Sequence, residues 1–317
     1  MGEFIIMLRN VLMFVALAIP GYVLVKCGMV KSEQSGILSK MLMYVGMPFM
    51  IISGTVNNLT LSAELMLQMV IVAAVGVAYT IVWFLVSGPM TAGEKNEKTA
   101  AMMRFCGVFG NNGFLGLPLA IAVFGRDSRV FTLLIVLNII NNLLLYTLGT
   151  YLVSGDKKSM SLKKALLNPV LIGFAVGIVM NLLNVKELIP EAATFSDHFS
   201  GIVTPVSMTV LGMKLANVKL SSLVTSKKNY YVSLIKLILV PVVIIGLLIA
   251  ARLIFDVSND VILAFFIAFA VPTAGLSSTF ADMYNGDTEH AVVFTLGSTL
   301  YSIFTIPILF WILNLFI

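Results

Sequence analysis

Polar side chains and helix-breaking residues gather in the middle of a long apolar stretch between residues 99 and 124. Buried amides are costly unless hydrogen-bonded, glycine weakens a helix, and proline removes a backbone donor and clashes with the preceding turn. We therefore predict a broken helix whose second half begins near Gly113, with free N–H groups and a positive dipole end at the break. Such a break can bind an anion without a charged side chain. The residues concerned are Asn111, Asn112, Gly113, Gly116 and Pro118.

A second apolar stretch near the end of the chain has the same character. Pro272 and Gly275 predict an interruption, while Thr273, Ser277 and Ser278 supply hydroxyl groups. Hydroxyls alone predict little, because serine and threonine also bond to carbonyls of their own helix. Two helices broken at mid-membrane would bring their half-helix ends to one place. We therefore predict that both stretches contribute to one binding site.

Further polar residues are expected to frame this site. Asn138 and Asn142 are four residues apart and share one face of a helix. Ser53 follows Pro48 in another apolar stretch, and Pro205 interrupts a third. Packing between helices explains the two asparagines equally well, since amide side chains also join helices in membranes.

The composition of the chain indicates a membrane protein. Of the 317 residues, 59% are hydrophobic and only 11% are charged, whereas soluble proteins carry roughly 25% charged residues. The mean hydropathy is +1.02. These values exclude a soluble enzyme, a disordered chain and a nucleic-acid-binding protein. The lipid bilayer is therefore the expected partner, and nucleic acid is not.

Ten apolar runs are each long enough to cross a bilayer as a helix, which satisfies every backbone group internally. The runs are 4–25, 36–56, 64–88, 99–124, 128–153, 168–185, 199–216, 231–255, 260–282 and 290–316. The expected fold is therefore an all-α integral membrane protein with ten transmembrane helices.

A polar cytoplasmic linker, residues 156–166, divides the ten runs into two halves, residues 1–155 and 167–317. Because five is odd, the second half enters the membrane inverted relative to the first. Pro205 follows Pro48 by 157 residues, and Pro272 follows Pro118 by 154. The pattern predicts two inverted five-helix repeats with broken helices 4 and 9, which is typical of secondary transporters.

The distribution of lysine and arginine predicts the orientation. Fifteen of these residues lie in odd-numbered loops, and five lie in even-numbered loops or near the N-terminus. The positive-inside rule then places both termini outside. No charged residue is expected at the centre of a span, because Lys214 and Lys236 are predicted near helix ends, where they can snorkel. No motif for a metal, a cofactor or an enzyme nucleophile is present, so no enzymatic activity is expected.

With these features the chain resembles the auxin efflux carrier family, which includes plant PIN-formed carriers and bacterial malate or malonate permeases. The resemblance covers the whole chain and rests on Asn111-Asn112-Gly113 with Pro118, and on Ala270 to Pro272. It implies a fold similar to bile-acid symporters and sodium/proton antiporters, with a scaffold and a moving crossover domain. It also implies transport of small carboxylates and a homodimer.

The sequence thus predicts a secondary transporter for a small organic anion in a bacterial plasma membrane, working by alternating access. Two alternatives stay open. A symporter or antiporter of related fold, coupled to Na⁺ or H⁺, would coordinate the cation with the same asparagines and hydroxyls. A membrane sensor with a carrier fold would bind the ligand without moving it.

Overall fold

The structure is a computed structural model that describes residues 2–58, 62–161, 163, 166–218 and 220–317. Part of the predicted linker (162, 164 and 165) and Lys219 lie outside the described residues. Within the described residues, six helical segments are long and apolar enough to cross a membrane. They are Ile5–Lys26, Ser32–Val56, Ala63–Met90, Arg129–Ser154, Lys227–Ala251 and Thr288–Leu313. The expectation of an all-helical membrane protein is confirmed.

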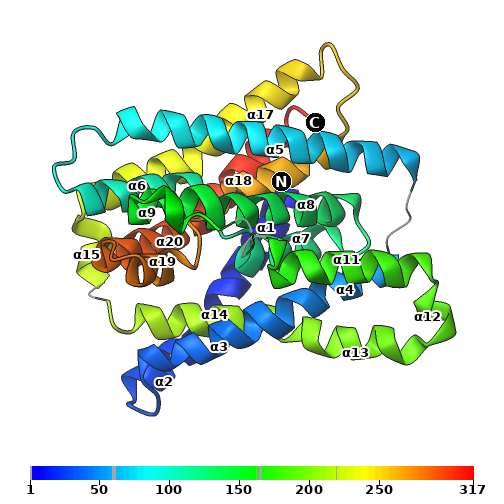
Figure 1. Cartoon of the computed structure of the whole chain (residues 1–317), viewed down its shortest axis with the longest axis horizontal. Coiled ribbons are helices and arrows are strands. Elements are labelled where there is room, and N and C mark those ends of the chain that lie inside the picture. The colour runs from blue at the N-terminus through cyan, green and yellow to red at the C-terminus, as the bar shows by residue number, and fades with distance from the viewer. Residues whose placement is uncertain (1, 59–61, 162, 164–165, 219) are drawn as a thin grey trace.

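Most of these segments are built from shorter helices in series. Up to residue 155 the helices are α1 (Gly2–Ala16), α2 (Ile19–Lys26), α3 (Ser35–Met41), α4 (Met47–Asn58), α5 (Ala63–Met90), α6 (Glu97–Val108), α7 (Leu117–Phe124), α8 (Arg129–Leu144) and α9 (Thr150–Ser154). After it they are α11 (Pro169–Leu182), α12 (Val185–Leu188), α13 (Pro190–Gly201), α14 (Val203–Leu215), α15 (Leu220–Thr225), α16 (Lys227–Leu234), α17 (Val240–Ala251), α18 (Asn259–Ala270), α19 (Ser277–Met283) and α20 (Thr288–Leu313). Figure 1 shows most of them lying side by side along the long axis of the molecule.

Polar side chains begin many of these helices. Each accepts a hydrogen bond from a backbone N–H of the first turn, a group that has no partner within the helix. The capping residues are Ser62, Asn96, Ser128, Asn168, Ser226, Ser258 and Asp287. Asn168 differs from the exposed cap Asn96 because it is buried.

Wide π-helical turns end two residues before three of the prolines. The turns are η2 (Leu42–Gly46) before Pro48, η3 (Asn112–Gly116) before Pro118 and η6 (Ile235–Leu239) before Pro241. A π turn makes room for the proline ring, which would clash with a regular turn. Beside Pro118, the Phe114 carbonyl accepts a hydrogen bond from Ser207 Oγ at 3.1 Å. The helix therefore continues through Pro118, and the break lies at residues 109–111 instead of at this proline.

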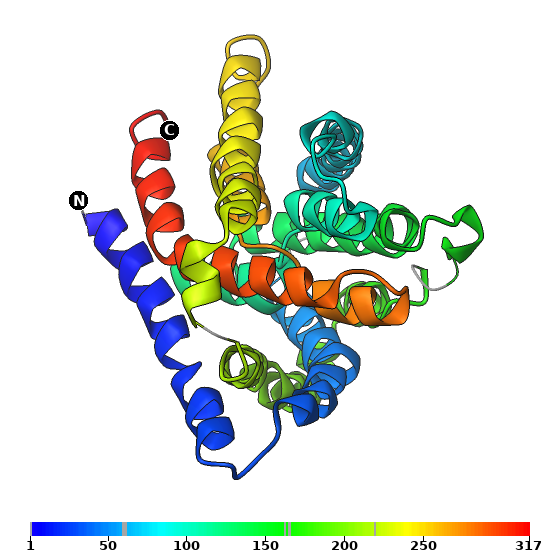
Figure 2. The same cartoon turned by 90° about the vertical axis from the view of Figure 1, so that its left-hand side faces the viewer.

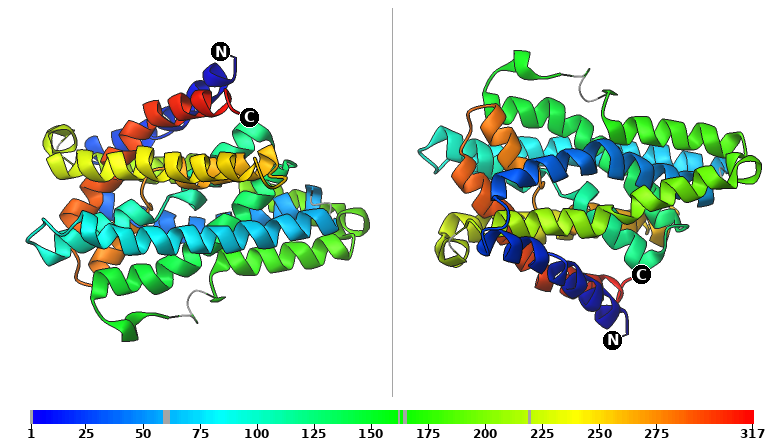
Figure 3. Two further views of the ribbon diagram at one scale, coloured as in Figure 1. Left: turned by 90° about the horizontal axis from the view of Figure 1, so that it is seen from above. Right: turned by 90° about the horizontal axis from the view of Figure 1, so that it is seen from below.

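Close helix pairs connect segments far apart in the sequence. Helix α4 packs along α11, α2 along α14, and α1 along α20. A Cβ added to Gly173 of α11 would lie 2.8 Å from the Pro48 Cα, so glycine permits this approach. Because α1 and α20 are neighbours, the two ends of the chain lie close together (Figures 2 and 3).

Helix α8 occupies the centre of the bundle. It packs against α5 on one side and α18 on another. Residues from α8 and α18, such as Leu134 and Phe265, are fully buried in the main hydrophobic core. The two helices therefore hold the neighbouring chain breaks in fixed positions.

We expect Gly173→Leu to destabilise the protein by about 1–3 kcal/mol, because the added side chain overpacks the α4–α11 contact. The measurement is thermal unfolding in detergent. Gly246→Leu is the matched control, since Gly246 also lies in a helix but has no atom within 4 Å of an added Cβ. Equal melting temperatures for the two variants would contradict the proposed close contact.

Candidate functional site

Two non-helical segments, residues 109–111 and 271–276, interrupt the fourth and ninth apolar runs and cross each other. The Asn111 N–H donates to the Pro272 carbonyl at 2.8 Å, and the Ala274 N–H donates to the Phe109 carbonyl at 3.0 Å. Gly110 and Thr273 form an isolated antiparallel bridge between them. Each break thus supplies a hydrogen-bond partner for backbone groups of the other break that have none within their own helix.

Side chains from two long helices complete the crossing. Asn141 of α8 accepts a hydrogen bond from the Gly110 N–H at 3.3 Å and donates one to the Gly110 carbonyl at 3.2 Å. Ser298 of α20 accepts one from the Thr273 N–H at 3.2 Å. A single amide and a single hydroxyl therefore satisfy backbone groups at the centre of the bridge.

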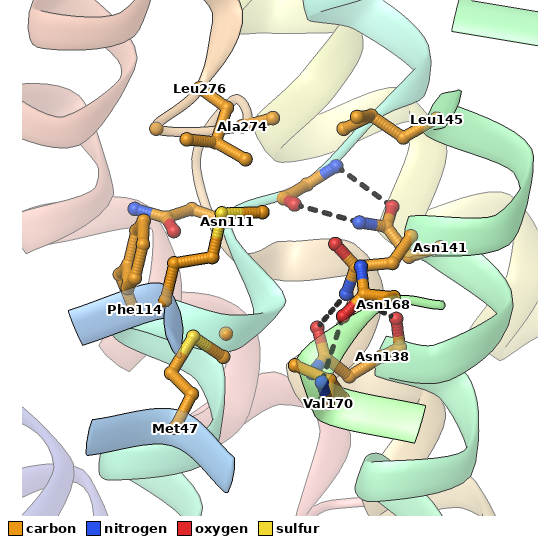
Figure 4. A pocket seen from close by; sticks show the side chains of 15 residues that line it. Met47, Asn111, Phe114, Asn138, Asn141, Leu145, Asn168, Val170, Ala274 and Leu276 are labelled. Carbon is orange, nitrogen blue, oxygen red and sulfur yellow. Dashed lines mark hydrogen bonds between the residues drawn. The ribbon is translucent and has the colours of Figure 1, made fainter. Parts of the chain in front are cut away.

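A small cavity lies beside this crossing (Figure 4). Its volume is about 40 Å³. Five asparagines line it, together with apolar residues that include Met43, Met47 and Phe114. The asparagines are Asn111, Asn138, Asn141, Asn142 and Asn168. No acidic or basic side chain is among the described lining residues.

The hydrogen-bond network orients two of these amides. Asn142 Nδ2 donates to the Asn138 carbonyl at 2.8 Å and to Asn138 Oδ1 at 3.1 Å. Asn168 Oδ1 accepts from the Val170 N–H at 2.8 Å, as the cap of α11. These bonds identify the Oδ1 atoms of Asn138 and Asn168 as acceptors that have donors within the protein. The buried Nδ2 groups of the same two residues have no hydrogen-bond partner in the protein.

Helix ends add to the polarity of the cavity. The half-helix formed by η3 and α7 begins at Asn112, and α11 begins at Pro169. Residues at both starts, including Gly113 and Val170, line the cavity. Because a helix N-terminus carries partial positive charge, both ends favour a negatively charged ligand. Unpaired N–H donors favour the same ligand class.

The residues expected to bind substrate separate into two groups in the structure. Those that line the cavity are Asn111, Gly113, Asn138, Asn142 and the helix-break residue Gly275. Asn112 does not line it, because its side chain lies at a second, smaller cavity with Lys236. From the ninth run, Ala274 and Leu276 contribute in place of the expected hydroxyl residues.

The expected hydroxyls have other partners. Thr273 and Ser277 are fully buried and bond to hydroxyls of α20, including Thr295. Ser278 Oγ accepts from Lys214 Nζ at 3.4 Å. Ser53 bonds to Asp197 and accepts from Arg126 Nη1 at 2.7 Å.

The remaining helix-break residues mark other irregularities. Gly116 ends the π turn η3, Pro48 follows η2, and Pro205 lies in the first turn of α14. Pro272 lies in the second non-helical segment and accepts the backbone bond described above.

The sequence prediction missed Asn168 as a site residue and was wrong about Lys236. The pair Asn168-Pro169 is a helix-start signal, which places the amide at the beginning of α11. Lys236 lies in η6, well inside the span Lys227–Ala251, and its side chain is fully buried rather than snorkelling. In the sequence, Lys236 lies near the start of an apolar run and close to Lys227 and Lys228, so it was interpreted as a residue near a helix end.

Comparisons with known proteins identify a family model that matches nearly the whole chain and two relatives that each match 65% of it. A sequence model of the family described as "Membrane transport protein" matches residues 6–161 and 157–312. This match confirms the resemblance to the auxin efflux carrier family. The chain is 28% identical over 216 residues to an uncharacterized transporter from Methanothermobacter thermautotrophicus, covering 65% of this chain and 67% of the relative. It is 27% identical over 215 residues to an uncharacterized transporter from Methanocaldococcus jannaschii, covering 65% and 68%.

We expect Asn141→Leu to destabilise the crossing by about 1–3 kcal/mol for each Gly110 backbone group that it leaves unpaired. The melting temperature in detergent measures the loss. Asn10→Leu is the control, because the half-buried Asn10 lies far from the crossing in sequence and its side chain donates to the Ile6 carbonyl of its own helix. A loss for Asn141→Leu no larger than that for Asn10→Leu would contradict the role assigned to Asn141.

Proposed function

Because the chain belongs to the membrane transport protein family, we propose that it is a secondary transporter for a small organic carboxylate in a bacterial plasma membrane. The carboxylate binds in the asparagine-lined cavity at the crossing of the two broken helices. The relatives named above are described as transporters, which supports the general activity. The substrate class rests on the chemistry of the cavity.

One observation carries the choice of an anion. Asn138 and Asn168 line the cavity, and their buried atoms without a hydrogen-bond partner are amide nitrogens, which donate hydrogen bonds. A carboxylate oxygen accepts such bonds, and the two helix N-termini stabilise its charge. Sodium instead requires oxygen ligands, and each Oδ1 of these two residues has one of its two lone pairs occupied by a hydrogen bond within the protein.

The volume of the cavity supports alternating access. A water molecule occupies at least about 10–15 Å³ by the same kind of measure, so about 40 Å³ holds only a few waters. An organic anion therefore needs a wider state. The cavity lies between the crossing segments on one side and η2, α4 and α11 on the other. Relative movement of these two groups widens it.

Helices α13 and α14 belong with η2, α4 and α11, because α13 packs against α4 and α14 packs against η2. Polar contacts between the two groups lie at opposite ends of the molecule. Arg126, which follows α7, pairs with Asp197 of α13 at 2.6 Å. Lys214 of α14 donates to the Gly275 carbonyl of the crossing at 3.4 Å. In Figure 1, α13 lies towards one end of the long axis and α19, next to this second contact, towards the other. We propose that the Arg126–Asp197 and Lys214–Gly275 contacts each close one end of the path to the cavity, and that they break alternately during transport.

The proposal includes two inverted five-helix repeats. Asn141 and Ser298 support the crossing in equivalent ways and are 157 residues apart, as are Pro48 and Pro205. The family matches also fall on the two halves of the chain. The packing of α1 along α20 supports placing both termini on one side. With Lys236 removed from the loops, the lysine and arginine count still favours that side being outside.

We expect Asn168→Asp to reduce carboxylate uptake about tenfold to a hundredfold, because it replaces a donor by a negative charge while keeping the helix cap. Asn96→Asp is the matched control, since it changes an exposed cap in the same way. The measurement is uptake of labelled malate and malonate into proteoliposomes. Full uptake by a well-folded Asn168→Asp carrier would exclude this cavity as the binding site.

The same vesicles distinguish the alternatives. Uptake that occurs only with a Na⁺ or H⁺ gradient would identify a coupled carrier of the same substrate. Saturable binding of malate or malonate without flux would instead identify a sensor and would overturn the proposed transport.

A further inference from the structure

An apolar groove of about 300 Å³ lies at the surface of the bundle, between α17, α18 and the end of α20. On α17 it is lined by Val242, Ile245, Gly246 and Ile249, whose spacing of three and four residues places them on one face of the helix. Gly246 has no side chain, and a Cβ added there would have no atom within 4 Å. The middle of this helix face is therefore open.

The C-terminal end of α20 forms the facing wall. Leu309, Ile312 and Leu313 lie on one face of this helix, and Phe316 follows beyond its end. Phe266 of α18 and Leu313 are almost fully buried, whereas Phe316 is exposed at the edge of the groove. Figure 2 shows α17 and this end of α20 diverging from each other. Every described residue that lines the groove is apolar.

The groove has the length of one leaflet of a bilayer. Val242 lies close to the middle of the span Lys227–Ala251, and Arg252 follows the last residue of that span. The segment from Val242 to Arg252 rises roughly 15 Å along a helix, which is half of a hydrocarbon core about 30 Å thick. The groove therefore runs along α17 from the middle of the membrane towards one of its surfaces, in the direction of a lipid acyl chain.

Exposed apolar side chains adjoin the end of the groove nearest to that surface. Leu253, Ile254 and Phe255 follow Arg252, and their exposed fractions are 88%, 79% and 66%. Large apolar side chains at the end of a span are stabilised by contact with lipid instead of water. We therefore expect this end of the groove at the boundary between acyl chains and headgroups.

A polar network joins the three elements of the groove at the same end. Arg252 Nη1 donates to Asn259 Oδ1 at 2.8 Å, and Asn259 Nδ2 donates to the Ile317 carbonyl at 3.3 Å. Arg252 is exposed and belongs to no ion pair of the described residues. Because a guanidinium has five N–H donors in a planar fork, Arg252 can bind a phosphate while it bonds to Asn259.

Two acidic residues accompany this arginine. Asp256 lies in the loop between α17 and α18, and Asp260 follows Asn259 in the first turn of α18. Neither carboxylate forms an ion pair within the part of the chain that the structure describes. The charge at this end is therefore mixed. It favours a headgroup with both a phosphate and an ammonium group over a headgroup with negative charge alone.

We propose that the groove is a binding site for a phospholipid with a primary amine headgroup, of the phosphatidylethanolamine class. One acyl chain lies in the groove over Gly246, the phosphate binds Arg252, and the ammonium group faces Asp256 and Asp260. Because lipid tails are as apolar as the groove, filling it adds packing but no hydrophobic free energy. The headgroup contacts therefore decide which lipid binds. The groove shares no described lining residue with the asparagine-lined cavity, so the proposal does not depend on transport.

The first test measures melting temperatures of lipid-depleted protein in detergent. The added lipids are phosphatidylethanolamine, phosphatidylglycerol with the same acyl chains, and diacylglycerol, which lacks the phosphate. We expect phosphatidylethanolamine to raise the melting temperature of the wild type several degrees more than the other two. Arg252→Gln is expected to respond to it as to diacylglycerol, whereas Arg252→Lys keeps the charge and part of the response. An equal effect of phosphatidylglycerol or diacylglycerol on the wild type would overturn the proposal.

A second test fills the groove. Gly246→Leu places a side chain where the acyl chain is expected, so it should abolish the response to phosphatidylethanolamine without lowering the lipid-free melting temperature. Gly36→Leu is the matched control, because Gly36 also lies in a helix and has no atom within 4 Å of an added Cβ. A full response of Gly246→Leu would contradict the proposal. So would a change in its oligomeric mass by light scattering, because a second copy of the chain would then occupy the groove.

Native mass spectrometry tests the wild type without any variant. The protein is offered equal amounts of phosphatidylethanolamine and phosphatidylglycerol and is then activated by gas collisions. We expect one phosphatidylethanolamine molecule to stay bound at collision energies that remove phosphatidylglycerol. Equal retention of the two lipids would overturn the assignment of the groove.

Discussion

The interior of a membrane offers a backbone N–H or C=O group no water to bond with, and two interrupted helices satisfy this constraint by pairing with each other. The bonds from Asn111 to Pro272 and from Ala274 to Phe109 require both breaks to lie at the same depth and to cross in one register. Asn141 and Ser298 then pair with the groups that remain on Gly110 and Thr273. The positions of α8 and α20, and of the cavities around them, follow from this crossing.

The crossing also separates charge. The starts of η3–α7 and of α11 point to the cavity that has unpaired amide donors, whereas the ends of α6 and α18 point to Lys236. A broken helix always exposes one positive and one negative end, so a site for an anion creates a need for positive charge nearby. In the proposed mechanism the substrate binds at the first end, and Lys236 lines the cavity at the second.

Much of the fold was predictable from local chemistry. The apolar runs identified helices because the hydrophobic requirement of a span is strong and continuous, and the polar clusters identified both interruptions. The second half of the fourth run was expected to begin near Gly113, and it begins at Asn112. Pro118 was expected to contribute to this break, but the π turn before it accommodates the ring, and the helix continues through it. Lys236 was misassigned because a helix end and a buried position within a span are both compatible with a single lysine near a run boundary.

The sequence by itself determined that the chain is a helical membrane protein of a transporter family, with polar breaks in two runs. Only the tertiary structure decided which side chains meet at the cavity. Asn111 lines it while Asn112 lies on the far side, and Ala274 lines it while Thr273 bonds to α20. In the second break, successive residues such as Thr273 and Ala274 point in opposite directions, so a shift of one residue exchanges the two sides. The register is set by hydrogen bonds to a segment about 160 residues away, and no local pattern contains that information.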